Sequence, residues 1–105
     1  MKRILSVFLA FLLIAVSLPV VYGASIFDGF VCEINDSGTY TITGYRDFYT
    51  DYANIPAKIN DIEVTAIGNG AFQSKSNLNT VRIPETVTTI GAMAFYGCRN
   101  LTSVI

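Results

Sequence analysis

Polar and apolar residues alternate along residues 80–83, which is the pattern of a short strand buried on one face. Successive side chains of a strand lie on opposite faces. Val81 and Ile83 are therefore expected to point into a core, and Thr80 and Arg82 to point outward. The next residue is a proline, which ends the strand because it has no N–H to donate to a sheet.

The residues after this strand predict a second extended piece and a tight turn. Residues 87–90 are expected to be extended, and Gly91 is expected to close them with a turn at positive φ. Ala94 and Phe95 are then expected to point inward from a short 3₁₀ turn. The pattern thus predicts a circuit with one strand and several turns.

The main signal in the sequence is an internal repeat. When residues 64–82 are compared with residues 87–105, a shift of 23 residues, 9 of the 19 positions are identical. The identical pairs are Val64/Val87, Thr65/Thr88, Ile67/Ile90, Gly68/Gly91, Ala71/Ala94, Phe72/Phe95, Asn77/Asn100, Leu78/Leu101 and Val81/Val104. A period of this length predicts a solenoid, in which each unit buries its apolar side chains against the next unit. Phe72 is therefore expected to be buried and stacked on a buried Phe95.

The segment before the repeats predicts a β-hairpin. Residues 30–34 and 39–43 resemble two strands joined by the turn-forming residues 35–38. We interpret this hairpin as a cap on the open end of the solenoid. Residues 46–54 are polar and aromatic and are expected to form a loop, so that the cap and loop together span residues 24–54.

Residues 55–105 then hold about two and a half repeats, of which the first is irregular. A solenoid usually needs three or more repeats and a cap at each end to be stable. The repeats are therefore expected to be incomplete at the C-terminus, and the chain to be the front of a longer protein or a truncated reading frame.

The repeats also match a longer sequence motif, in addition to the 23-residue period. It consists of Ile67-Gly68-Asn69-Gly70-Ala71-Phe72, Leu78, Val81-Arg82-Ile83-Pro84, Val87 and Ile90-Gly91-Ala92-Met93-Ala94-Phe95-Tyr96-Gly97-Cys98-Arg99-Asn100-Leu101. This pattern resembles the BspA-like leucine-rich repeat family, closely over residues 55–105, and residues 30–45 resemble the strand pair that often precedes its first repeat. The resemblance implies a leucine-rich repeat solenoid, β-rich with short 3₁₀ or helical turns.

The N-terminus predicts export. Lys2 and Arg3 precede an apolar run at residues 4–16, a proline ends the stretch, and small residues follow, which is the order of a secretory signal peptide. We expect cleavage after Gly23, so that residues 1–23 are removed. An uncleaved anchor is the alternative, because the apolar stretch is close to the shortest that spans a bilayer. After cleavage, we expect a secreted or cell-surface protein with no membrane span.

Composition excludes several functions. The chain has 105 residues and no histidine, and without the two basic residues of the signal peptide it carries five basic and eight acidic side chains, a net charge of −3. An acidic chain does not favour nucleic-acid binding. Without histidine, the commonest general base and metal ligand is missing, so we expect no catalytic residue, metal or cofactor. The close acidic pairs, Asp47 with Asp51 and Asp61 with Glu63, are interpreted as solvated surface.

The two cysteines, Cys32 and Cys98, are either one disulfide or two buried thiols. Export permits a disulfide, but Cys98 lies inside an apolar pattern, where a free thiol packs as a small hydrophobe. Cys98 also falls at the cysteine position of the family motif, which Lys75 occupies in the earlier repeat. We favour buried thiols.

Two candidate contact surfaces follow from these patterns. Their residues are Thr80, Arg82 and Ser103 on the exposed strand face and, with a weaker case, Tyr45, Tyr49 and Tyr52. Tyrosine is favoured in interfaces, although several of these rings could instead pack the cap.

The resemblance implies a non-catalytic module for protein–protein recognition and adhesion, with an extracellular, host or cell-surface protein as the partner. The alternative is a set of accessory spacer repeats in a larger secreted enzyme or cell-wall-binding protein, whose catalytic domain would lie beyond Ile105. Further repeats downstream would favour the first hypothesis, and a new domain would favour the second.

Overall fold

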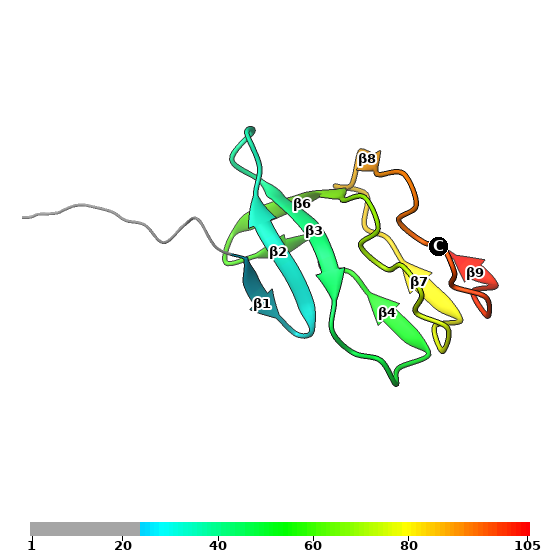
Figure 1. Ribbon diagram of the computed structural model, residues 1–105. Coiled ribbons are helices and arrows are strands. Elements are labelled where there is room, and N and C mark those ends of the chain that lie inside the picture. The colour runs from blue at the N-terminus through cyan, green and yellow to red at the C-terminus, as the bar shows by residue number, and fades with distance from the viewer. Residues whose placement is uncertain (1–23) are drawn as a thin grey trace, which may run out of the picture.

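The computed structural model describes residues 24–105, and the predicted signal segment lies outside the described residues. Within this range the chain forms strands and turns but no helix. The strands are β1 (Ser25–Phe27), β2 (Phe30–Ile34), β3 (Tyr40–Tyr45), β4 (Tyr52–Asn54), β5 (Lys58–Ile59), β6 (Ile62–Ile67), β7 (Thr80–Arg82), β8 (Thr89–Ile90) and β9 (Ser103–Val104). Figure 1 shows how they follow one another along the body of the molecule.

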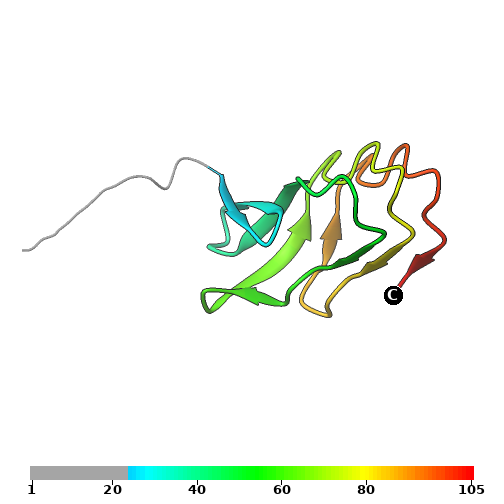
Figure 2. The same ribbon diagram turned by 90° about the horizontal axis from the view of Figure 1, so that it is seen from below.

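Each circuit of the chain contributes one strand to each of two sheets. β3, β6 and β8 pair in parallel in the first sheet, and β4, β7 and β9 pair in parallel in the second. The circuits lie beside one another as successive coils (Figure 2). This arrangement confirms the predicted leucine-rich repeat solenoid, but the expectation of one strand per circuit is wrong, because the extended piece at residues 87–90 contains β8.

Turns form the remaining side of each coil. Residues 68–78 lie against residues 91–101, and backbone hydrogen bonds join them; the Phe72 N–H, for example, donates to the Ala94 carbonyl at 2.8 Å. Within each segment, several N–H groups donate to the carbonyl three residues earlier. These segments are therefore successive single turns and not the short helices that the sequence allowed.

The predicted N-terminal hairpin is confirmed. β2 pairs with β3 in antiparallel orientation, and the side chain of Asn35 holds the turn between them. Its carbonyl oxygen accepts hydrogen bonds from the N–H groups of Ser37 and Thr39, and its amide donates to the Thr41 hydroxyl. β1 adds an antiparallel strand that the sequence did not predict. Because β3 pairs with β6, the hairpin covers the end of the first sheet.

The segment at residues 46–54 ends in β4, so the prediction of a loop is wrong for its last three residues. The Asp51 carbonyl accepts the N–H groups of Asn79 and Thr80, and one coil later the Asn79 carbonyl accepts two N–H groups in the same way. The segment therefore takes the place of a coil in front of the first predicted repeat. Its strand depends on pairing with β7, which lies far away in the sequence.

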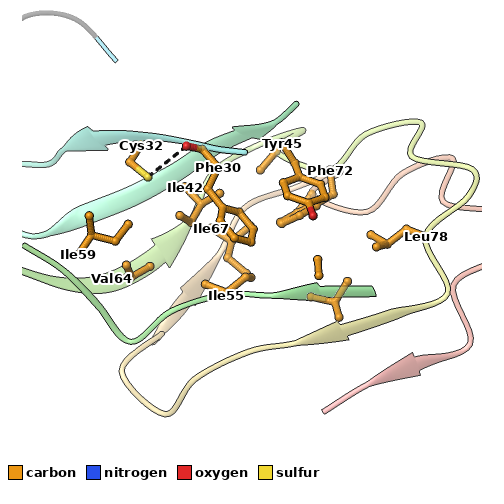
Figure 3. Close-up of a cluster of buried hydrophobic side chains, with 14 residues drawn as sticks. Phe30, Cys32, Ile42, Tyr45, Ile55, Ile59, Val64, Ile67, Phe72 and Leu78 are labelled. Carbon is orange, nitrogen blue, oxygen red and sulfur yellow. Dashed lines mark hydrogen bonds between the residues drawn. The ribbon is translucent and has the colours of Figure 1, made fainter. Parts of the chain in front are cut away.

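The core contains a column of four aromatic rings, three of which are labelled in Figure 3. Phe30 stacks on Tyr45 with ring centroids 4.7 Å apart, Tyr45 lies 5.4 Å from Phe72, and Phe72 stacks on Phe95 at 5.3 Å and 13°. The predicted stacking of Phe72 on Phe95 is confirmed. Phe72 is fully buried, but Phe95 is only half-buried, because no described coil packs against its other side.

Gly91 is required for a reason other than the predicted one. It does not have a positive φ. Its N–H donates to the Ile67 carbonyl at 2.7 Å, which brings the turn close to the coil beside it. A Cβ at this position would lie 2.5 Å from the nitrogen of Asn69 and 2.7 Å from the carbonyl carbon of Gly68. The close approach of two backbones therefore excludes a side chain here.

Candidate recognition surface

The strands of the second sheet present one continuous outward face. Tyr52, Thr80 and Ser103 are direct neighbours in the register of β4, β7 and β9, and Asn54 lies beside Arg82. The residues between them point inward, as strand alternation requires. We call these five residues the outer face. Figure 1 shows the three strands that carry it side by side.

The burial of β7 follows the predicted alternation. Val81 is fully buried and Arg82 is exposed, whereas Thr80 is half-buried. Ser103 is also half-buried, and Tyr52 is 45% exposed. No ion pair joins the Arg82 guanidinium to another residue in the range 24–105. The outer face thus combines one free cation with an aromatic ring, two hydroxyls and an amide.

Asn54 is a residue of the outer face that the sequence analysis missed, because residues 52–54 were expected to be a loop. A signal was present: Ile-Pro follows β4, as it follows β7. The register pairs Tyr52 with Thr80, an offset of 28 residues instead of the 23 of the repeat. The additional residues lie around β5 and its turn into β6, and they hide the relation between the two strands.

The structure separates the three tyrosine candidates. Tyr45 is in the core at 8% exposure, where burial, followed by the nearby charges of Asp47 and Asp28, raises the pKa of its phenol. Tyr45 therefore packs the cap, the alternative left open for these rings. Tyr52 is on the outer face, and Tyr49 is 90% exposed in the loop before it.

The loop that carries Tyr49 is attached to the repeats by specific contacts. The Asp47 carboxylate accepts hydrogen bonds from the N–H groups of Tyr49 and Thr50. The ammonium of Lys75 lies 3.6 Å from the centroid of the Phe48 ring, a cation–π contact. The two hydrogen bonds give Asp47 a role in the shape of the loop, and the cation–π contact joins the loop to the repeats.

A groove borders the outer face where the chain leaves the second sheet. It lies between residues 54–57 of one coil and residues 82–86 of the next and has a volume of about 530 Å³. Asn54 and Arg82 belong to both the groove and the outer face. The remaining walls include Ile55, Ile83 and Glu85.

Both cysteines are free thiols, which excludes the disulfide alternative. Cys32 is fully buried, and burial raises its pKa from 9.0 to about 11. Cys98 is half-buried and donates a hydrogen bond to the Phe72 carbonyl at 2.9 Å. Burial raises the pKa of Cys98, and the neighbouring Lys75 acts in the opposite direction.

The described part of the chain holds neither a cluster of metal-ligating side chains nor a membrane-spanning helix. Within the range 24–105, no cluster of three or more cysteine, aspartate or glutamate side chains is placed to hold a metal ion. The same part of the chain contains no helix with the length and apolarity needed to cross a membrane.

The chain belongs to the BspA-type leucine-rich repeats. The family model, described as "BspA type Leucine rich repeat region (6 copies)", matches residues 23–105, which include the cap, the segment at residues 46–54 and the repeats at residues 55–105. Repeats of this class typically serve as binding modules rather than as catalysts. No curated protein matches the chain.

Solved structures with the same fold come from several bacteria. A leucine-rich repeat protein from Bacteroides capillosus is 32% identical with a TM-score of 0.71, over 78% of this chain and 64% of that protein. A leucine rich cell surface protein from Faecalibacterium prausnitzii is 34% identical with a TM-score of 0.71, over 77% and 22%. A leucine-rich repeat protein from T. pallidum is 25% identical with a TM-score of 0.71, over 76% and 37%. The chain thus spans less than two thirds of each of these proteins.

Proposed function

We propose that this chain is a non-catalytic recognition module that binds an extracellular, host or cell-surface protein through its outer face. The proposal rests on one observation: three successive coils bring side chains of different chemistry into register on one exposed face. Tyrosine and arginine are, with tryptophan, the residue types enriched at binding hot spots. Tyr52 and Arg82 are accordingly the residues expected to contribute most.

The proposed location is outside the cytoplasm. The order of basic, apolar and small residues at the N-terminus supports export, and the similar protein from Faecalibacterium prausnitzii is described as a cell surface protein. N-terminal sequencing of the exported protein should begin at or next to residue 24. An exported chain that still starts at Met1 would refute cleavage.

The proposed binding can be tested with the whole protein immobilised on a surface and exposed to extracellular-matrix and cell-surface proteins. Arg82→Ala and Tyr52→Ala should each weaken binding by about tenfold or more, because hot-spot side chains contribute more than about 1.4 kcal/mol. Both variants should remain folded, since an exposed substitution usually changes stability by less than about 0.5 kcal/mol.

Matched controls are available on the turn side of the coils. Arg99 and Tyr96 are exposed there, away from the outer face, so Arg99→Ala and Tyr96→Ala should leave binding unchanged. The combined change of Asp61 and Glu63 to alanine should also have little effect. Equal losses in the outer-face variants and in the controls would refute the outer face as the binding site.

The alternative function is that of accessory spacer repeats in a larger secreted enzyme or cell-wall-binding protein. It is supported by the length of the structural relatives, because the chain covers only a small fraction of some of them, for example 22% of the protein from Faecalibacterium prausnitzii. Under this alternative, no outer-face variant changes binding, while deletion of a whole coil changes the activity of the complete protein.

A further inference from the structure

The groove beside the outer face exists because the hydrogen-bond ladder between two coils is interrupted. The Ile55 N–H donates to the Arg82 carbonyl at 3.1 Å, and the next backbone bond between these coils runs from Thr88 to the carbonyl of Thr65. Between them stand Pro56 and Pro84, which have no N–H. No backbone–backbone bond therefore joins the two coils at this corner, where instead the Thr86 hydroxyl donates to the Ala57 carbonyl at 3.5 Å.

The interruption leaves one backbone acceptor without its ladder donor. In a parallel pair, the N–H and the C=O of one residue point toward the same neighbouring strand. The N–H of Ile55 reaches Arg82, so its C=O is directed toward the position of Pro84, which has no N–H to donate. A ligand in the groove can supply the missing N–H.

The walls of the groove carry both apolar and charged side chains. Pro56 on one coil and Ile83-Pro84 on the next are partly exposed and form apolar surface, whereas the side chain of Ile55 is buried in the core. Arg82 and Glu85 also line the groove and carry opposite charges. A volume of about 530 Å³ lies within the usual range for sites that hold a small ligand or a few residues of a peptide.

We propose that this groove binds an extended peptide segment of the partner protein that carries a carboxylate side chain next to an apolar one. This proposal rests on the proposed recognition function and names the chemistry that the site accepts. The carboxylate pairs with the unpaired guanidinium of Arg82, whose planar donors match a carboxylate in a bidentate geometry. The apolar side chain lies between Pro56 and the Ile83-Pro84 step, and a peptide N–H donates to the Ile55 carbonyl.

Glu85 gives the groove a direction. A carboxylate held at Arg82 is attracted there, whereas a second carboxylate near Glu85 is repelled, so the peptide is bound in one orientation. The groove therefore favours a segment with a single acidic residue over a run of acidic residues.

The probe is a set of acetylated and amidated alanine-based hexapeptides, each with one aspartate or glutamate and one leucine, either adjacent or separated by up to four alanines. A matched set has asparagine or glutamine in place of the acidic residue, and a third set has a second aspartate or glutamate in place of one alanine. The whole protein, labelled with ¹⁵N, is titrated with each peptide to 5 mM, and the amide signals of Ala57 and Thr86 in the groove walls are followed.

At least one acidic peptide should shift both signals, and the matched amide peptide should bind about tenfold more weakly, since a hydrogen bond to a charged group contributes more than about 1.4 kcal/mol. Arg82→Gln should cause the same loss, Glu85→Gln should tighten the binding of peptides with two acidic residues, and Arg99→Gln should change nothing. Absence of shifts with every acidic peptide, or equal binding of the amide set, would overturn the proposal.

The same variants separate this proposal from the recognition function. If no peptide binds but Arg82→Ala and Tyr52→Ala still weaken binding of the intact partner, the groove proposal fails and the outer face remains. If peptides bind at the groove but neither variant affects the intact partner, the recognition function fails. The amide signals of the groove could also shift when the protein concentration alone is raised. If they do so in the wild type and not in Arg82→Gln, a second copy of the chain occupies the groove, and the peptide proposal is overturned.

Discussion

Truncation of Phe72 to alanine tests the packing of the aromatic column. Phe72 is fully buried and lies between the ring of Tyr45, at 5.4 Å, and the ring of Phe95, at 5.3 Å, with Phe30 at 6.4 Å. Its removal therefore leaves a cavity between Tyr45 of the cap and Phe95 of the following coil. It also weakens the contact between neighbouring units, which is the contact that stabilises a solenoid.

The expected loss follows from these contacts. Removal of a buried phenylalanine side chain costs about 3–5 kcal/mol, and each aromatic pair adds about 0.5–1.5 kcal/mol beyond burial. With three rings in contact, we expect Phe72→Ala to lower the free energy of unfolding by about 5 kcal/mol. Since domains of this kind are stable by about 5–15 kcal/mol, this loss removes about a third or more of the stability.

Two further variants calibrate the result. Phe95 is half-buried and stacks on one ring only, so Phe95→Ala should lose about 2 kcal/mol, below the range for a fully buried ring. Phe72→Leu keeps an apolar side chain in the core and should lose about 1.5 kcal/mol.

Urea unfolding measures all three variants, with far-ultraviolet circular dichroism for the sheets and the near-ultraviolet tyrosine signal for the packing of Tyr45. A loss below about 1 kcal/mol in Phe72→Ala, or a loss no larger than that of Phe95→Ala, would refute the reasoning.

Three further predictions concern glycine and cysteine. Gly91→Ala should lower the free energy of unfolding in urea by about 1–3 kcal/mol, because the new Cβ would collide with backbone atoms. Gly38→Ala should lower it less, because a Cβ there has a strained positive φ but meets no atom within 4 Å. Equal losses in the two variants would contradict the close approach at Gly91. A thiol reagent at pH 8 should modify the half-buried Cys98 before the buried Cys32, and reaction of Cys32 at the same rate would place it outside the core. The folded state holds the Cys32 proton more tightly than the unfolded state, so its contribution to stability is present below pH 9 and is lost as the pH rises toward 11; the loss, about 2–3 kcal/mol, should be absent from the urea midpoints of Cys32→Ala.

The features that repeat or that form locally could be predicted from the amino-acid sequence. The shift of 23 residues identified the solenoid and placed Phe72 beside Phe95. The alternation at residues 80–83 placed Arg82 outside and Val81 inside. The hairpin at residues 30–45 was predictable because its turn is closed by a neighbouring side chain, that of Asn35. Each of these features depends on interactions within a short stretch or between identical positions.

Features that depend on a distant partner of different sequence could not be predicted and became visible in the folded chain. β4 is three residues long and is held by β7, 28 residues further along, so neither its own pattern nor the 23-residue shift revealed it. Tyr45 and Tyr52 have the same side chain, and only the position of the column placed one in the core and the other on the outer face. The groove likewise arises where Pro56 and Pro84 come opposite each other. In each case, the decisive interaction joins segments whose pairing is set by how the coils stack.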